Sequence, residues 1–201
     1  MHKSEKEKML AGEIYNPMDE ELTRLRFKSR KLSRQFNSTD DPDEILRREI
    51  LNELLGAFGE SSELLPTISF DYGFNTFIGN NCFFNFNTTF LDCAEIKIGS
   101  RVLVGPNCSF MTPIHPMLYS ERTMIDNGKG GYYEPEYAKA IVVGDDCWIG
   151  GNVTIIGGVS IGAKSVIGAG SVVTKNIPEG VFAAGVPCKV IRKINEEDTI
   201  L

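Results

Sequence analysis

Residues 143–173 read VGDDCWIGGNVTIIGGVSIGAKSVIGAGSVV, and the spacing within this stretch decides the fold. An aliphatic side chain returns at every sixth position, namely at Val143, Ile149, Ile155, Ile161, Ile167 and Val173. Such a strict period is typical of a solenoid, whose units bury their apolar faces only by stacking on neighbours. A six-residue unit is a short strand and a turn, and three units close a triangular coil. Such coils stack at about 4.8 Å, so the stretch predicts a mainly β protein built as a parallel β-helix.

The same period extends toward the N-terminus. It includes Ile78, Phe84 and Phe90, slips by two residues, and resumes at Ile98, Val104 and Phe110. The slip predicts a bulge or a longer corner. A second inward slot, four positions after each aliphatic residue, holds mostly small side chains: Cys82, Thr88, Ala94, Val102, Cys108, Cys147, Val153, Val159, Ser165, Ser171 and Ile177. Three of the five cysteines occupy this slot and none forms a C-x-x-C pair, which indicates reduced core cysteines.

The repeat is lost between residues 113 and 140 and returns directly afterwards. Prolines and glycines interrupt this segment, which predicts a long loop that projects from the coil. Long loops in compact domains are usually functional. His115 lies at the root of the loop, in Thr112-Pro113-Ile114-His115-Pro116, and His2 is the other histidine of the chain. A neutral imidazole can take a hydroxyl proton near neutral pH, so His115 is the candidate general base.

The first part of the chain has a different rhythm, because its apolar residues recur three and four apart as in amphipathic helices. We expect helices over 4–11, over 18–36 and from about 41 to 58, with Gly12 and Gly59 ending the first and the third. The chain is thus divided into a helical segment, 1–60, a β-helix domain, 61–193, with its loop at 113–140, and a tail, 194–201.

The composition narrows the class of partner. The chain has 201 residues and a formal charge of −6, which argues against general binding of nucleic acid or of an anionic membrane. No apolar run approaches the roughly 20 residues that span a bilayer. The first residues lack the apolar stretch of a secretory signal. We therefore expect a cytoplasmic protein with a small-molecule substrate.

Several stretches together resemble the maltose and galactoside O-acetyltransferase family of hexapeptide-repeat acyltransferases. They are EKEKMLAGE at 5–13, DYGFN at 71–75, IGNNCFFNFN at 78–87, LD at 91–92, TPIHP at 112–116, VGDDCWIGG at 143–151, VIGAGSVVTK at 166–175 and AGVPCKVI at 184–191. The resemblance implies a left-handed coil, a homotrimer with active sites between subunits, and acetyl-CoA as co-substrate. It also implies that the helical segment caps the acceptor side.

The resemblance further implies a role for single residues. His115 would deprotonate a sugar hydroxyl, which attacks the thioester of acetyl-CoA directly. The acceptor would meet Asp19, Arg26, Asp71, Asn85 and Asp92. The backbone N–H of Gly151 would stabilise the oxyanion, with Trp148 nearby. CoA would lie against Ala169, Thr174, Lys175, Gly185, Lys189 and Arg192. No metal is implied.

Three other interpretations were weighed. A zinc enzyme on the same coil needs a cluster of histidines, and His115 is the one histidine of the repeat region. A scaffold without catalysis leaves the His115 junction and the loop unexplained. Within the acetyltransferases, the acceptor could instead be an antibiotic or an amino or cell-surface sugar. The loop residues 117–139, with several tyrosines, look longer than in the maltose and galactoside enzymes, and Glu136 is a candidate to orient His115.

Overall fold

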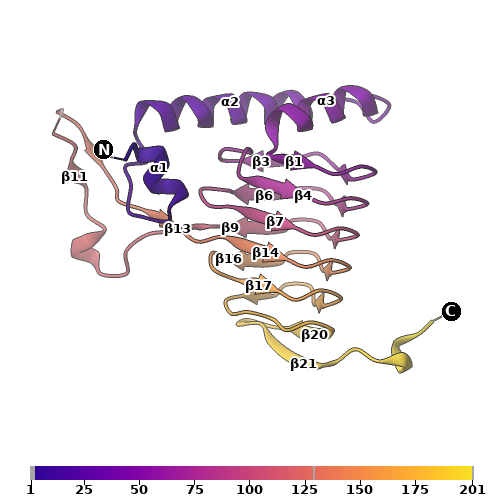
Figure 1. Ribbon diagram of the computed structural model, residues 1–201. Coiled ribbons are helices and arrows are strands. Elements are labelled where there is room, and N and C mark those ends of the chain that lie inside the picture. Colours follow the sequence, from indigo (N-terminus) through magenta and orange to yellow (C-terminus); the bar gives the residue numbers. More distant parts are fainter. Residues whose placement is uncertain (1–2, 129, 201) are drawn as a thin grey trace.

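The computed structural model describes residues 3–128 and 130–200 of the protein, so that His2 lies outside the described residues. Within these ranges, helices α1 (Glu5–Leu10), α2 (Glu20–Asn37) and α3 (Glu44–Leu54) precede a stack of triangular β coils. Figure 1 shows α2 and α3 lying across the first coil, while the last coil and the C-terminus lie at the opposite end of the stack.

The third helix is shorter than the sequence predicts. It ends at Leu54, and the expected extension to Phe58 is wrong because residues 57–58 form the first strand of the coil. Gly56 donates its backbone N–H to the Thr76 carbonyl, which starts the pairing. A Cβ on Gly56 would lie 2.4 Å from the Phe74 carbonyl oxygen, so this close approach requires glycine. At residues 57–58, strand pairing therefore outweighs the helical spacing of the apolar side chains.

Three sheets form the sides of the coil in the described residues. Sheet I contains, in spatial order, β1 (Ala57–Phe58), β4 (Thr76–Ile78), β7 (Ile96–Ile98), β14 (Ile141–Val143) and β17 (Ser160–Ile161). Sheet II contains β2 (Glu63–Leu64), β5 (Phe83–Phe84), β8 (Leu103–Val104), β15 (Trp148–Ile149), β18 (Val166–Ile167), β20 (Val181–Ala184) and β21 (Lys189–Lys193). Sheet III contains β3 (Ile68–Phe70), β6 (Thr88–Leu91), β9 (Ser109–Met111), β16 (Thr154–Ile156) and β19 (Val172–Val173). The pairs are parallel except β20 with β21, which folds back antiparallel.

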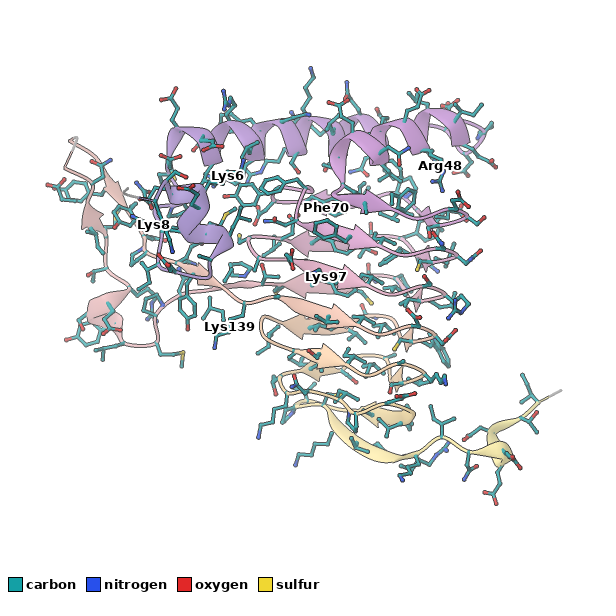
Figure 2. The ribbon with its side chains drawn as sticks, in the orientation of Figure 1. Lys6, Lys8, Arg48, Phe70, Lys97 and Lys139 are labelled. Carbon is teal, nitrogen blue, oxygen red and sulfur yellow. The ribbon has the colours of Figure 1, made fainter. Side chains whose placement is uncertain are left out.

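The inward side chains are those that the period predicts. Every residue of the six-residue register is buried, and so are the slot residues apart from Ala94, which is only partly buried. All five cysteines are free and buried. Phe70, Phe90 and Phe110 stack through the centre of the first coils, with ring centroids 4.5 and 5.0 Å apart. Figure 2 shows Phe70 inside the coil directly below the helices.

The corner between sheets III and I differs between the two parts of the stack. Phe83 pairs with Leu103, twenty residues along, whereas Trp148 pairs with Val166, eighteen residues along. The two extra residues of the earlier coils lie between β6 and β7, where the sequence period slips. The long loop leaves the coil at the same corner, between β9 and β14.

The loop carries its own short elements. β10 (Pro113–Ile114) pairs antiparallel with β13 (Tyr137–Ala138), and β11 (Ile125–Asp126) pairs with β12 (Tyr132–Tyr133); between them lies the 3-10 helix η1 (Tyr119–Glu121). In Figure 1 this loop projects from the coil on the same side as α1. A second 3-10 helix, η2 (Glu196–Asp198), lies in the C-terminal tail. None of the helices within the described ranges has the length and apolar character to cross a membrane.

Candidate active site

His115 directly follows β10, where the loop leaves the rigid coil. Its ring is about half exposed, at 46%, so it can reach a bound molecule. Nδ1 lies 3.2 Å from the carbonyl oxygen of Pro135 on the returning arm of the loop. A carbonyl oxygen only accepts hydrogen bonds, so we assign the ring proton to Nδ1. The Nε2 lone pair is then available to accept a proton.

Glu136 lies beside the other ring nitrogen of His115. Its Oε2 is 3.9 Å from Nε2, and its side chain is only 13% exposed. The Tyr15 hydroxyl donates a hydrogen bond to Oε1, and the Cys93 thiol lies 3.7 Å from the same oxygen. Burial raises the pKa of both Tyr15 and Cys93, so each keeps its proton and remains a donor at neutral pH.

Asp71 extends this wall on the other side of Cys93. The Cys93 sulfur is 3.8 Å from Asp71 Oδ2, and the Arg30 guanidinium is 3.7 Å from Oδ1. Burial raises the pKa of Asp71, while the positive charges of Arg30 and Arg26 oppose that effect. Asp71, Cys93, Glu136 and His115 therefore form one continuous polar wall at the corner between sheets III and I.

A second group of candidates lies on a different corner, between sheets II and III. Asn85 follows β5 there, and Gly151 follows β15 two coils further along. Ala169 lies on the next coil, since a Cβ on Gly150 would be 2.7 Å from its backbone nitrogen. Gly185 follows, accepting a hydrogen bond from the Val172 N–H. Small residues thus line one column of corners, and sheet III separates this column from His115.

Comparisons with known proteins show the family of this chain. The maltose acetyltransferase hexapeptide capping motif matches residues 8–59, and the hexapeptide repeat of succinyl-transferase matches residues 140–175. The galactoside O-acetyltransferase of Escherichia coli (strain K12) is 40% identical over 193 residues, which cover 96% of this chain and 90% of that protein. The chain belongs to the maltose and galactoside O-acetyltransferase family.

Solved structures of the family have the same coil as this acetyltransferase. A maltose O-acetyltransferase from Clostridium difficile 630 superposes with a TM-score of 0.89 at 41% identity, covering 96% of this chain and 99% of that one. A galactoside acetyltransferase in complex with coenzyme A gives 0.89 at 38% identity, covering 98% and 94%. The fold class, a left-handed parallel β-helix of hexapeptide repeats after N-terminal helices, is confirmed, and so is the acyltransferase class.

The structure places some acceptor candidates of the acetyltransferase inside the protein. Asp92 is fully buried, and its carboxylate accepts hydrogen bonds from the Tyr72 N–H at 2.8 Å and the Thr76 hydroxyl at 3.1 Å. Burial raises the pKa of Asp92 to about 6, against the opposing effect of these donors. Asp92 therefore holds the corner together from within, next to Cys93 and Asp71, and contact with an acceptor stays a prediction.

The two candidates from the helices also have local partners. Asp19 is the N-cap of α2 and accepts from the backbone N–H groups of Glu21 and Leu22. Arg26 donates to the Tyr72 hydroxyl at 2.7 Å, and its guanidinium lies 5.7 Å from the ring centre. Arg26 thus connects α2 to the polar wall, while Asp19 stabilises the helix end.

The CoA candidates of the acetyltransferase all belong to the last coils. Thr174 and Lys175 follow β19, and Lys189 and Arg192 lie on the exposed strand β21. Arg192 is already paired with Asp198 of the tail. Among the described residues, no three His, Cys, Asp or Glu side chains gather as a metal site would require.

Tyr15 and Cys93 were missed by the sequence analysis. Tyr15 comes from the N-terminal segment, and no local pattern marks it. Cys93 had a signal, because it falls outside the small inward slot at the point where the repeat slips. A cysteine outside that slot at the wider corner is expected to face something other than the core.

Proposed function

We propose that this protein transfers an acetyl group from acetyl-CoA to a hydroxyl of a sugar of the maltose, glucose or galactoside type. The observation that carries the proposal is the half-exposed His115 ring, whose Nδ1 lies 3.2 Å from the Pro135 carbonyl oxygen, so that the Nε2 lone pair can accept a proton. Support comes from family members that are named maltose and galactoside O-acetyltransferases, one of them solved with coenzyme A.

His115 would act as general base in a direct transfer. Nε2 accepts the proton of the acceptor hydroxyl, and the hydroxyl oxygen forms a bond to the thioester carbonyl carbon. The C–S bond then breaks, and the CoA sulfur takes the proton from Nε2. The thioester is already activated, so the reaction needs no nucleophilic serine or cysteine. The backbone N–H of Gly151 is the donor that we propose for the carbonyl oxygen in the tetrahedral intermediate.

The acceptor would lie against the polar wall beside His115. Asp71 and Glu136 offer carboxylate oxygens, which accept hydrogen bonds from neighbouring sugar hydroxyls. Asn85 would supply an amide from the other column of corners. A neutral polyhydroxylated molecule suits these two carboxylates better than an anion does, because they would repel a negative charge placed between them.

A complete site would need two copies of the chain, because sheet III separates His115 from Asn85, Trp148 and Gly151. We therefore propose a homotrimer with active sites between subunits. The outward side chains of sheet II support this proposal. They form a column, called here the outer column, which consists of Phe83, Leu103, Trp148, Val166 and Phe182 in strand register. Leu103 and Trp148 are 50% and 55% exposed, and large exposed apolar patches usually mark contact surfaces.

The CoA phosphates would meet Lys175 and Lys189, whose side chains are exposed at the last coils. The pantetheine arm would pass along Ala169 and Gly185. We place the reaction in the cytoplasm, a reducing compartment that suits the five free cysteines. The N-terminal helices would cap the acceptor side. We keep the proposed domain organisation, in which a helical segment, 1–60, precedes the β-helix domain, 61–193, and a tail, 194–201.

The test is release of the CoA thiol in the presence of glucose, maltose or a galactoside, with wild type beside His115→Ala. We expect turnover in the wild type and a loss of about 10²–10⁴-fold or more in the variant, since a positioned base contributes that much. Binding of CoA, measured by calorimetry, should be retained. Near-normal turnover of His115→Ala would contradict the mechanism, and absence of CoA binding in the wild type would contradict the function.

A further inference from the structure

The N-terminal segment is fastened to the returning arm of the loop at one point. Tyr15 and Glu136 form an isolated antiparallel bridge, in which the Tyr15 N–H donates to the Glu136 carbonyl at 3.1 Å. The Tyr15 hydroxyl donates to Oε1 of the same residue. A Cβ on Gly12 would lie 3.3 Å from the Ala138 carbonyl, so the two segments run in close contact. Backbone and side chain of Tyr15 together therefore fix Glu136.

The residues fixed in this way contact both nitrogens of His115. Pro135 presents its carbonyl oxygen to Nδ1 at 3.2 Å, and Glu136 presents Oε2 to Nε2 at 3.9 Å. The His115 ring itself emerges from β10, which pairs with β13 directly after Glu136. The orientation of the ring therefore depends on where residues 135 and 136 are held, and Tyr15 holds them from outside the loop.

The separation of 3.9 Å has a chemical consequence. It is too long for a hydrogen bond, so Glu136 leaves the Nε2 lone pair for the acceptor hydroxyl. It is short enough for a carboxylate to stabilise the imidazolium that forms after proton transfer. A glutamate with both oxygens free to rotate could move onto Nε2 and block it. The hydrogen bond from Tyr15 to Oε1 prevents that movement.

We propose that Tyr15 is a positioning residue for the catalytic histidine and that it acts through Glu136. This inference rests on the proposed function, because it concerns the same base. Tyr15 is buried, and its raised pKa keeps the hydroxyl protonated as a donor. The competing interpretation is simple packing, since the ring belongs to an apolar cluster with Met9, Leu22 and Tyr72. The hydroxyl distinguishes the two, because a phenylalanine keeps the ring.

The kinetic test compares Tyr15→Phe with Tyr132→Phe, the same change at an exposed tyrosine of the loop. We expect Tyr15→Phe to lower kcat by about 10- to 100-fold, the effect of misplacing a catalytic group. The KM for acetyl-CoA should stay within about twofold, because the CoA candidates lie on the last coils. In a Glu136→Ala background, Tyr15→Phe should cause no further loss, since the hydroxyl then has nothing to hold.

A second measurement does not depend on turnover. The chain contains two histidines, so ring-labelled protein gives one pair of imidazole C–H signals from each, from Cδ2 and Cε1, in a carbon–proton correlation spectrum, and a His2→Gln variant assigns them. Tyr15→Phe should move or broaden the His115 signal, and Tyr132→Phe should not.

The outcomes separate the two proposals. An unchanged His115 signal in Tyr15→Phe, or a kcat within about twofold of wild type, overturns the positioning role. A loss that is equally large in the Glu136→Ala background also overturns it, because the hydroxyl would then act independently of Glu136. A wild type that acetylates no sugar, with the His115 signal still shifted in Tyr15→Phe, contradicts the proposed function while supporting the positioning contact.

Discussion

Asp92 is a carboxylate without exposed surface, and its chemistry is set by that burial. The Tyr72 N–H and the Thr76 hydroxyl both donate to it, so the ionised form has partners. Burial nevertheless disfavours the charge and raises the pKa to about 6, and the nearby Asp71 carboxylate adds to this effect. The residue therefore binds a proton more tightly in the folded protein than in the unfolded chain, where the pKa is about 3.9.

The sign of the resulting pH dependence follows directly. Protonation of Asp92 favours the folded state, so its stabilising contribution is fully present below about pH 4 and is lost as the pH rises through about 6. A shift of about two units corresponds to ~3 kcal/mol in the free energy of unfolding. Urea unfolding of wild type and Asp92→Asn at pH 4, 5 and 6.5 measures it. We expect the free energy of unfolding of the wild type to fall relative to that of the variant as the pH rises from 4 to 6.5. If the two free energies changed in parallel with pH, the prediction would be contradicted.

Single residues also show how far sequence reasoning reaches into the site. The position of His115 at the root of the loop could be predicted, because it stands alone at the point where a strict repeat breaks, while its catalytic role stays a prediction. The surroundings of Asp92 could not, since its partners Tyr72 and Thr76 belong to the preceding coil and their direction depends on the width of one corner. Tyr15 was out of reach for the same reason, because its partner lies 121 residues away.

The strands of sheet III carry a ladder of aromatic rings through the first coils. Phe90 lies between Phe70 and Phe110, nearly parallel to both, with interplanar angles of 4° and 5°. Phe90 therefore packs on two rings of the ladder, and its centroid also lies 5.7 Å from that of Phe84. Coils separated by one inter-strand spacing bring equivalent positions face to face, so the twenty-residue length of these coils aligns the three rings.

Removing the central ring should leave a cavity that the coils above and below cannot close. We expect Phe90→Ala to lower the free energy of unfolding by about 3–5 kcal/mol. Phe27→Ala, which truncates an exposed ring on α2, is the matched control and should change it by about 0.5 kcal/mol or less. Denaturant unfolding of both variants measures the difference. Equal losses would mean that the ladder contributes nothing beyond ordinary surface contacts.

At the level of elements, the period predicted the strands well and the helix ends less well. The inward positions follow from spacing alone, because any other register would place aliphatic side chains in water. The end of α3 does not follow from spacing, since Ala57 and Phe58 suit a helix locally. Their pairing with Phe77 and Ile78 decides the outcome, and that pairing involves residues twenty positions away.

Across the whole molecule, the three sides of the coil are not equivalent toward solvent. The outer column of sheet II is apolar throughout, whereas sheet I presents Phe77, Lys97, Val142 and Ser160 in the corresponding register, two of them polar. In a closed cyclic trimer each chain contacts two neighbours through two different surfaces, and an apolar column on one side suits one of these contacts in the proposed homotrimer.

A charge in the outer column should therefore disrupt the assembly. We expect Leu103→Glu to convert the proposed trimer to smaller species, since an unpaired carboxylate would be buried between copies. Val142→Glu introduces the same charge at an exposed position of sheet I and should leave the assembly intact. Sedimentation velocity distinguishes the two. If the Leu103→Glu variant sediments with the same assembly mass as the wild type, the contact between copies of the chain lies elsewhere.

The contact between Tyr15 and Glu136 has a consequence for the order in which parts of the chain fold. Each coil can add to its predecessor through contacts about twenty residues apart, so the solenoid can grow from any point. The contact between Tyr15 and Glu136, by contrast, joins residues 121 positions apart. Closing a longer loop of chain costs more conformational entropy. During synthesis, Tyr15 leaves the ribosome long before its partner exists. The coils up to β9 can therefore form before Glu136 is available to hold the proposed base.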